Sequence, residues 1–146
     1  MFSHATDMMT LARTGPTRPA ILVVEDSDAL RVSLVDWLQF HFPDCRVHAT
    51  ESGEAALEEV RRLCPDVVLM DIDLPGIDGI EATRSIKSRL PSTVVVMLTM
   101  HDTPHHRLAA ARAGAVAYVP KHEIDQRLHL VIERLLRARD SGSNPG

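Results

Sequence analysis

The sequence predicts an α/β fold, a doubly wound parallel sheet of five strands covered by five helices. Short apolar runs rich in β-branched residues alternate with segments of helical periodicity, and the connections between them are short. The central run, residues 67–70, is apolar without alternation, as in a strand buried on both faces. The length of 146 residues suits one domain with a sizeable core, and 45% hydrophobic and 25% charged residues is an ordinary globular composition.

Each strand is expected where an apolar run meets a turn signal. In chain order these runs are residues 20–24, 45–49, 67–70, 93–98 and 116–119. Helices are expected after Ser27 or Asp28, between Ser52 and Pro65, and over residues 80–90, 104–113 and 123–139. Ser and Thr suit the N-cap positions, and Gly114 suits the end of the fourth helix. Short connections between alternating strands and helices require a parallel sheet with helices on both faces.

The ends of the first and third strands should lie together. A strand order of 2-1-3-4-5, as in a flavodoxin-like sheet, places the topological switch point between them, where open α/β sheets bind ligands. Glu25 and Asp26 follow the first strand, and Asp71 ends the third. Crowded carboxylates repel unless a cation relieves them, and Mg²⁺ takes one or two carboxylates together with phosphate oxygens. We expect Asp26 and Asp71 as direct ligands and Glu25 as a ligand through water. The backbone carbonyl of Asp73 would add another oxygen.

Two further strand ends complete a phosphoryl pocket. Thr99 ends the fourth strand and can donate its hydroxyl to a phosphate oxygen, while Lys121 follows the fifth strand and offers an ammonium group. Lys121 is informative because only it and Lys87 are lysines in a chain whose other basic residues are arginines. A carboxylate oxygen of Asp71 could attack phosphorus beside a bound cation. The simpler interpretations are a helix-capping threonine and a surface lysine.

These motifs resemble the receiver domains of bacterial two-component response regulators over about residues 20–139. The resemblance is carried by residues 21–26, by the stretch 71–79 (family pattern D-x-x-[LM]-P-x-x-[DG]-G), by Leu98-Thr99, and by residues 114–121. Together these motifs are specific, although each alone is weak. The run of residues 99–102 is similar to receivers of helix-turn-helix transcription regulators.

The resemblance implies roles for the site residues. Asp71 would be the phospho-acceptor, Glu25 and Asp26 the acid pair, Thr99 the switch hydroxyl, and Lys121 the family's lysine. The donor would be a phosphohistidine on a sensor histidine kinase or a histidine phosphotransfer protein. Apart from catalysing its own phosphorylation and dephosphorylation, such a domain is a switch and not an enzyme.

The family's switch would continue through Tyr118. After phosphorylation Thr99 moves toward the phosphoryl oxygens, and Tyr118 turns into the space it leaves. The surface formed by the fourth helix, fifth strand and fifth helix then shifts, so that it binds partners or a second copy of the chain. One new dianion would bias this two-state element.

Three positions are expected to tune the reaction. Asp73 and His101 occupy the variable positions two residues beyond Asp71 and Thr99. Met100 stands where many family members have a small side chain, and we predict that it restricts water access and prolongs the phosphorylated state. A further departure is that Pro120 precedes Lys121, whereas many receivers have proline after the lysine. This leaves the isomer of the peptide after Lys121 open.

Two other classes of function use similar motifs. The residues Asp71-Ile72-Asp73 imitate the D-x-D nucleophile motif of haloacid-dehalogenase-like phosphatases, but those enzymes need a further acidic pair after the lysine. An EF-hand is disfavoured because Ala82 holds the position of its bidentate glutamate. Residues His101, His105 and His106 lack the partner pattern of a tetrahedral zinc site.

The sequence also suggests a domain organisation. We expect a leader over residues 1–19, a receiver domain over residues 20–139, and a polar tail or linker stub over residues 140–146. The net charge of −4 gives no reason to expect nucleic-acid binding, and no DNA-binding domain is expected. No apolar stretch approaches membrane-spanning length. Two cysteines, Cys45 and Cys64, fit reduced thiols in the cytoplasm.

Overall fold

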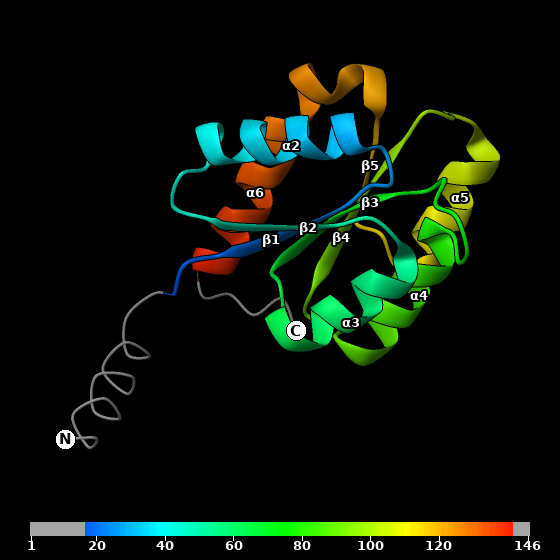
Figure 1. Cartoon of the computed structure of the whole chain (residues 1–146), viewed down its shortest axis with the longest axis horizontal. Helices are drawn as coiled ribbons and strands as arrows, with labels where there is room; N and C mark the ends of the chain where they lie inside the picture. The colour runs from blue at the N-terminus through cyan, green and yellow to red at the C-terminus, as the bar shows by residue number, and fades with distance from the viewer. Residues whose placement is uncertain (1–16, 142–146) are drawn as a thin grey trace.

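Residues 17–141, the part of the chain that the computed structural model describes, contain a five-stranded parallel sheet (Figure 1). Its order is β2-β1-β3-β4-β5, so the predicted doubly wound topology is confirmed. The strands are β1 (Ala20–Val24), β2 (Arg46–Thr50), β3 (Val67–Asp71), β4 (Val94–Thr99) and β5 (Ala117–Pro120). Each pair of neighbours is parallel, with Asp71 opposite Leu98 at the end of the β3–β4 ladder.

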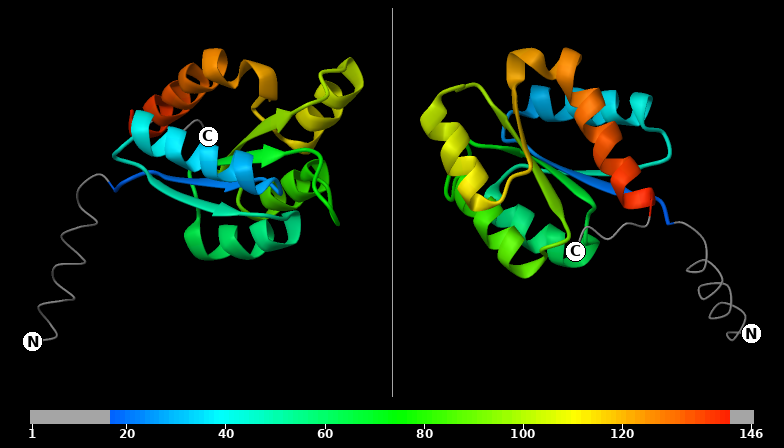
Figure 2. Two further views of the ribbon diagram at one scale, coloured as in Figure 1. Left: turned by 45° about the horizontal axis from the view of Figure 1, so that its top comes forward. Right: turned by 180° about the vertical axis from the view of Figure 1, so that it is seen from behind.

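Helices cover both faces of the sheet (Figures 1 and 2). They are α2 (Asp28–His41), α3 (Gly53–Leu63), α4 (Gly79–Arg89), α5 (Pro104–Ala113) and α6 (His129–Asp140). On one face, α2 and α6 bury leucines and isoleucines against the sheet in a first hydrophobic core. On the other face, α3, α4 and α5 pack smaller side chains, many of them alanines, in a second core. The strands are buried on both faces, which is why their sequences read as unbroken apolar runs.

Side-chain caps define where the helices begin. Ser27, Ser52 and Thr103 accept hydrogen bonds from the backbone N–H three residues later, as their residue types predict. Asp78 does the same for α4, through the N–H of Glu81, so that helix begins before the predicted residue 80. The Asp78-x-x-Glu81 spacing is a capping signal already present in the sequence. At the other end of α5, Gly114 adopts a left-handed conformation with φ 109°.

The last helical segment differs from the single helix predicted over residues 123–139. It consists of a 3₁₀ turn (Lys121–Glu123), a π-helical turn (Ile124–Leu128) and then α6. Neither the 3₁₀ turn nor the π turn has a capping side chain. The wider turn still leaves Ile124, Leu128 and Ile132 buried in the first core. Burial of these three residues therefore outweighs the cost of irregular backbone geometry.

The two ends of the described chain are tied together at the end of the sheet where β1 and β3 begin. Arg139 Nε lies 2.9 Å from Asp66 Oδ1, and Arg139 Nη2 donates to the carbonyl of Thr17. Asp66 Oδ2 accepts from the N–H of Ala20. Residues 1–16 and 142–146, which hold most of the predicted leader and tail, lie outside the described residues. None of the helices in residues 17–141 is long and apolar enough to cross a membrane.

Candidate functional site

Three carboxylates meet at the carboxyl edge of the sheet. Glu25 follows β1 directly, and Asp71 is the last residue of the neighbouring strand β3. Carboxylate oxygens of Glu25, Asp26 and Asp71 all lie within 4.8 Å of one another. Glu25 and Asp71 are 1% and 2% exposed, whereas Asp26 is exposed to solvent. The structure thus brings together the three acids that the sequence placed at the switch point.

Lys121 lies against the two buried acids. Its Nζ atom is 2.9 Å from Glu25 Oε1 and 3.3 Å from Asp71 Oδ1. The lysine side chain is itself 13% exposed, so these ion pairs are well shielded from water. Among residues 17–141 no peptide bond is cis, so the peptide after Lys121 is trans. Lys121 is therefore the cation of the pocket and not a surface lysine.

Burial dominates the electrostatics of this pocket. Desolvation raises the pKa of Asp71 to about 6; Lys121 opposes this rise and the Glu25 charge adds to it. Burial alone would lower the pKa of Lys121, but its hydrogen bonds and charge interactions with Glu25 and Asp71 raise it above the ordinary value. The ammonium group thus stays charged at neutral pH. Two carboxylates still share one lysine, which leaves the site with an excess of negative charge.

The backbone around Asp71 is held in place by short-range contacts. The N–H of Asp73 donates to Asp71 Oδ1 at 3.1 Å, and the N–H of Gly79 donates to the carbonyl of Ile72 at 2.9 Å. A Cβ atom on Gly79 would overlap the carbonyl oxygen of Asp71 and lie 2.8 Å from Cα of Ile72. Helix α4 can therefore start directly against the acceptor strand only because Gly79 has no side chain.

Replacing Gly79 with alanine is expected to lower the free energy of unfolding by about 1–3 kcal/mol, because the clash is with backbone that cannot rotate away. Chemical denaturation measures this change. Arg89→Ala, at the exposed end of the same helix, serves as the control and should stay within about 0.5 kcal/mol of the native chain. A Gly79→Ala protein as stable as this control would show that α4 does not need this close approach.

Thr99 and Tyr118 share one hydrogen-bond acceptor. Thr99 is fully buried; its hydroxyl donates to the carbonyl of His101 at 3.1 Å and accepts from the N–H of His101 at 2.9 Å. The Tyr118 hydroxyl donates to the same carbonyl. In this arrangement the Thr99 hydroxyl is engaged with the loop after β4 and not with the acids. The two residues that the family resemblance couples are thus physically linked through His101.

Arg107 and Asp102 hold Tyr118 from outside, a contact that the sequence reasoning missed. The guanidinium carbon of Arg107 lies 4.9 Å from the centre of the Tyr118 ring, and its Nε is 2.6 Å from Asp102 Oδ1. The Asp102 hydrogen bond raises the pKa of Arg107, and the reciprocal bond lowers the pKa of Asp102. No sequence pattern marks an arginine on α5 as a neighbour of a tyrosine on β5, because only the fold brings them together.

Two of the three predicted tuning residues, Asp73 and His101, contact each other beside the site. His101 Nε2 is 3.2 Å from Asp73 Oδ2, so the two variable positions contact each other across the pocket. Met100 is 71% exposed. Asp73 and His101 therefore link the loop after β3 to the loop after β4. Their influence on the reaction stays a prediction, as does that of Met100.

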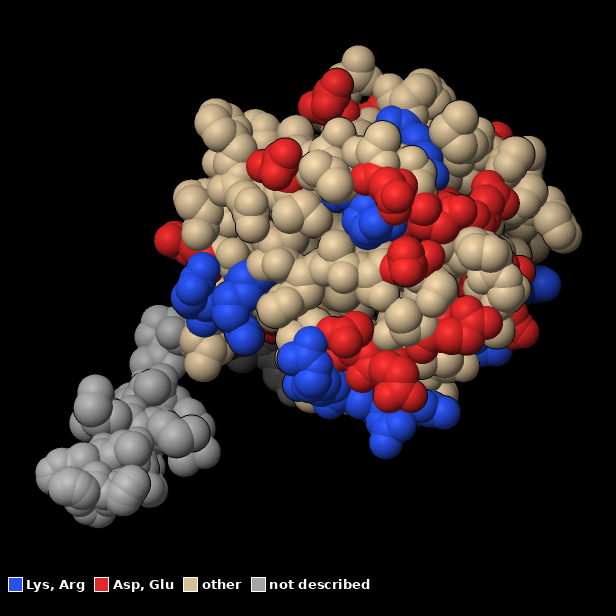
Figure 3. Space-filling view, in the orientation of Figure 1, with Lys and Arg blue, Asp and Glu red and all other residues tan. Residues whose placement is uncertain are grey.

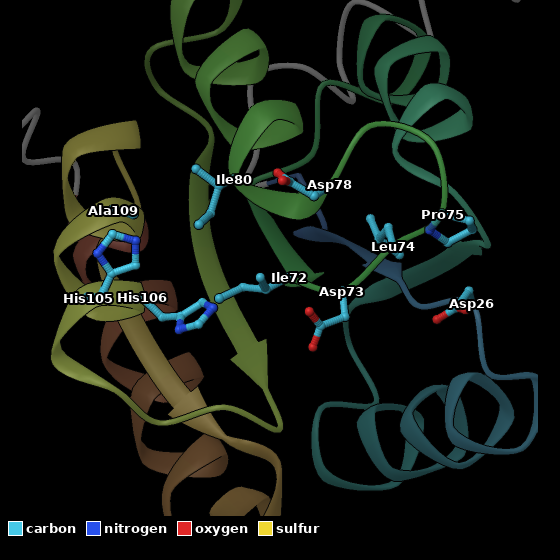
Figure 4. A pocket seen from close by; sticks show the side chains of 10 residues that line it. All are labelled: Asp26, Ile72, Asp73, Leu74, Pro75, Asp78, Ile80, His105, His106 and Ala109. Carbon is cyan, nitrogen blue, oxygen red and sulfur yellow. The ribbon is translucent and has the colours of Figure 1, made fainter.

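A cavity of about 530 Å³ opens beside the acids, between the loop after β3 and the start of α5. Figure 4 shows the side chains of Asp26, Asp73 and Asp78 around it, with His105 and His106 on the α5 side. Figure 3 shows acidic side chains gathered over one part of the molecular surface, with basic side chains along its lower edge. The cavity gives a solvent path to Asp26 and Asp73 at the predicted site.

The donor set fits a hard divalent cation. Glu25, Asp26 and Asp71 each offer a carboxylate oxygen within the same small space, and the backbone of Asp73 adjoins Asp71. Mg²⁺ prefers such oxygen ligands and keeps several waters, which the exposed side of Asp26 would admit. Excess negative charge and the raised pKa of Asp71 both favour a cation here.

The fold and site define a class, the doubly wound α/β domains that carry an acidic pocket at the switch point. The family model of the response regulator receiver domain matches residues 21–133. The chain belongs to the response regulator receiver domain family. Receiver domains interact with histidine kinases or phosphotransfer proteins and serve as signalling domains.

Individual relatives share this domain. The response regulator GacA of Pseudomonas viridiflava is 37% identical over 107 residues, covering 69% of this chain and 47% of the relative. Protein-glutamate methylesterase/protein-glutamine glutaminase 1 of Syntrophus aciditrophicus (strain SB) is 37% identical over 123 residues, covering 82% and 33% respectively.

Solved structures agree with these sequence matches. A two-component response regulator of the LuxR family from Aurantimonas sp. SI85-9A1 superposes with a TM-score of 0.76 at 32% identity, covering 82% of this chain and 85% of the other. The chain spans only 33% and 47% of the two curated relatives, so the shared part is their receiver domain.

Proposed function

We propose that this chain accepts a phosphoryl group on Asp71 from a phosphohistidine of a sensor histidine kinase or a histidine phosphotransfer protein, with Mg²⁺ bound. One observation carries the proposal: three acids and one lysine from different strand ends share one pocket in a chain of the receiver family. Chance turn chemistry does not place these four groups together. The phosphorylated chain then acts as a signalling switch.

The contacts of Asp71 suggest which oxygen reacts. Lys121 Nζ and the N–H of Asp73 both approach Oδ1, and no protein group among residues 17–141 forms a hydrogen bond or ion pair with Oδ2. We assign Oδ2 as the nucleophile. It forms a bond to phosphorus as the bond from phosphorus to the imidazole nitrogen of the donor breaks, and that nitrogen keeps the electron pair. The product is an acyl phosphate on Asp71.

The other pocket residues stabilise the charge that this transfer brings in. Asp26 and Asp71 would hold Mg²⁺ directly, Glu25 through water, and Asp73 through its backbone carbonyl. The cation supplies neutralisation of the phosphoryl oxygens. Lys121 already stands within ion-pair distance of the acceptor and can move its ammonium group onto a phosphoryl oxygen. Hydrolysis later returns the site to its starting state.

Labelling with acetyl phosphate in the presence of Mg²⁺ tests the proposal. The native chain should take up one phosphoryl group per molecule, and Asp71→Asn should take up none. Asp78→Asn is a matched control in the same loop, because asparagine can replace aspartate as the cap of α4. It should label like the native chain. Label retained by Asp71→Asn would place the acceptor elsewhere and overturn the assignment.

The switch would run through the shared His101 carbonyl. The His101 carbonyl accepts from the hydroxyls of both Thr99 and Tyr118. When the Thr99 hydroxyl leaves this carbonyl for a phosphoryl oxygen, the carbonyl that holds Tyr118 is itself held less firmly. Tyr118 can then turn, and the surface of α5, β5 and α6 changes. We propose this surface as the site of partner binding or homodimer formation. It corresponds to the fourth-helix, fifth-strand and fifth-helix face expected from the sequence.

Met100→Ala is expected to shorten the lifetime of the acyl phosphate more than about twofold, because the native side chain would restrict water near the phosphoryl group. Release of phosphate from the labelled protein measures this rate. Leu108→Ala, a change at an exposed apolar residue of α5 that does not line the cavity, is the comparison variant. Equal lifetimes for the native and Met100→Ala proteins would remove Met100 from the tuning residues, leaving Asp73 and His101.

The phosphatase alternative is not favoured. Of the two acids after Lys121, Glu123 pairs with Arg127 at 3.0 Å, and neither belongs to the acidic group of the site. We propose no further enzymatic activity for residues 20–139 and a cytoplasmic location. Residues 1–19 as a leader and residues 140–146 as a tail complete the proposed organisation, although Thr17 and Arg18 already bond to the domain.

A further inference from the structure

The loop between β3 and α4, residues 72–78, is anchored to the start of α3. We refer to it as the acceptor loop because it follows Asp71. The N–H of Ile77 donates to Glu54 Oε2 at 3.0 Å, a contact between residues 23 positions apart. Two further backbone hydrogen bonds close the loop on the carbonyl of Ile72, which accepts from the N–H of Leu74 at 3.0 Å and from the N–H of Gly79 at 2.9 Å. Glu54 therefore gives the far arm of the loop a fixed point outside the loop itself.

Two glycines permit this contact. Gly76 has φ +75°, and the Glu54 carboxylate fills the space that a Cβ atom on Gly76 would need. Gly53 is buried, and a Cβ atom there would lie 2.7 Å from Cγ1 of Ile77. Gly53 thus packs closely against Ile77, and Glu54 packs closely against Gly76. A side chain on Gly76 would displace the Glu54 carboxylate, and one on Gly53 would crowd Ile77, so either would disturb this contact.

The chemistry of Glu54 suits a fixed anchor. The Ile77 hydrogen bond, followed by one from its own backbone N–H, lowers the pKa of the Glu54 carboxyl group. Glu54 also lies in the first turn of α3, where the helix dipole favours a negative charge. Within residues 17–141 it forms no ion pair with a basic side chain. The hydrogen bond from Ile77 of the acceptor loop is thus the contact that Glu54 makes outside its own helix.

We propose that Glu54 is a positioning residue for phosphorylation. By fixing Ile77, it limits the positions open to Asp73, whose N–H contacts Asp71 and whose carbonyl would face the cation. Loss of the anchor would let the loop sample other conformations and so weaken Mg²⁺ binding without disturbing the core. This inference rests on the proposed role of Asp71, and it concerns the geometry of the loop and not the chemistry of transfer.

Three variants separate the hydrogen bond from the charge. Glu54→Ala removes both, Glu54→Gln keeps an acceptor oxygen without the charge, and Glu58→Ala removes one exposed charge from the same helix. Amide hydrogen exchange at Ile77, measured by NMR on the metal-free protein, reports the anchor directly. Exchange should be faster by about five- to tenfold in Glu54→Ala, and near native in Glu54→Gln and Glu58→Ala.

The second readout is the Mg²⁺ concentration that gives half-maximal labelling by acetyl phosphate. We expect it to rise about three- to tenfold in Glu54→Ala, with the labelling at saturating Mg²⁺ nearly unchanged. The proposal is overturned if this Mg²⁺ concentration is the same in Glu54→Ala and Glu58→Ala. An equal rise in Glu54→Gln would assign the effect to the charge of Glu54 instead of to its hydrogen bond. If the native chain does not label, the proposed function fails, whereas the exchange at Ile77 still decides the anchor.

Discussion

Replacing Lys121 with methionine is expected to destabilise the metal-free protein by about 3–5 kcal/mol at neutral pH. Methionine keeps much of the apolar stem but removes the cation that faces Glu25 and Asp71, which are 1% and 2% exposed. Two buried carboxylates would then face each other without compensation. The same variant should lose most of its rate of phosphorylation, because the ammonium group that would move onto a phosphoryl oxygen is gone.

Chemical denaturation with and without excess Mg²⁺ measures this loss. Mg²⁺ should restore much of the stability of Lys121→Met, because the ion would supply the missing positive charge. Lys87→Met is the comparison, since Lys87 instead bonds two backbone carbonyls at the end of α4. Its smaller loss should not respond to Mg²⁺. A Lys121→Met protein with native stability in the absence of Mg²⁺ would contradict the assignment of Lys121 as the counterion.

Replacing Asp71 with asparagine is expected to stabilise the metal-free protein by up to about 3 kcal/mol above pH 7. Burial raises the pKa of Asp71 from 3.8 to about 6, so the folded state holds this proton more tightly than the unfolded state. The native chain therefore loses stability as the pH rises through this range. The neutral amide has no such dependence.

The sign of the effect follows from that proton. Below about pH 3 the carboxyl group is mostly neutral in both states, and the two proteins should differ little. Unfolding free energies measured by denaturation at several pH values give the comparison. Asp36→Asn, an exposed change on α2, should leave the native profile intact. A stability difference that does not grow with pH would show that Asp71 is not the group that burial perturbs.

Local sequence was enough to predict the sheet. The apolar runs at residues 67–70 and 93–98 become β3 and β4 nearly as expected, because strands buried on both faces must be apolar throughout. The prediction of one regular helix was wrong over residues 123–128, where the structure has the end of a 3₁₀ turn and a π turn. Its apolar stripe indicated which residues are buried. The stripe did not indicate that the segment has no capping side chain, or that a 3₁₀ turn and then a π turn precede α6.

The site was predictable for residues whose chemistry is unusual at a strand end. Glu25, Asp26 and Asp71 are acids directly after apolar strands, so topology alone brings them together. The contacts of Glu54 and Arg107 could not be read in the same way. An acid in the first turn of a helix and an arginine on a helix surface are ordinary in a sequence. Their partners, Ile77 and Tyr118, lie on other elements, and only the folded structure brings them into contact.

The link between Arg139 and Asp66 sets how α6 can move. It fastens the last turn of this helix to the start of β3, at the edge of the sheet away from the acids. With that end fixed, the proposed rearrangement on activation would be a pivot, in which the displacement grows from Arg139 toward the start of α6. A spin label at the front of α6 would then report a large displacement, and one near Ser141 almost none.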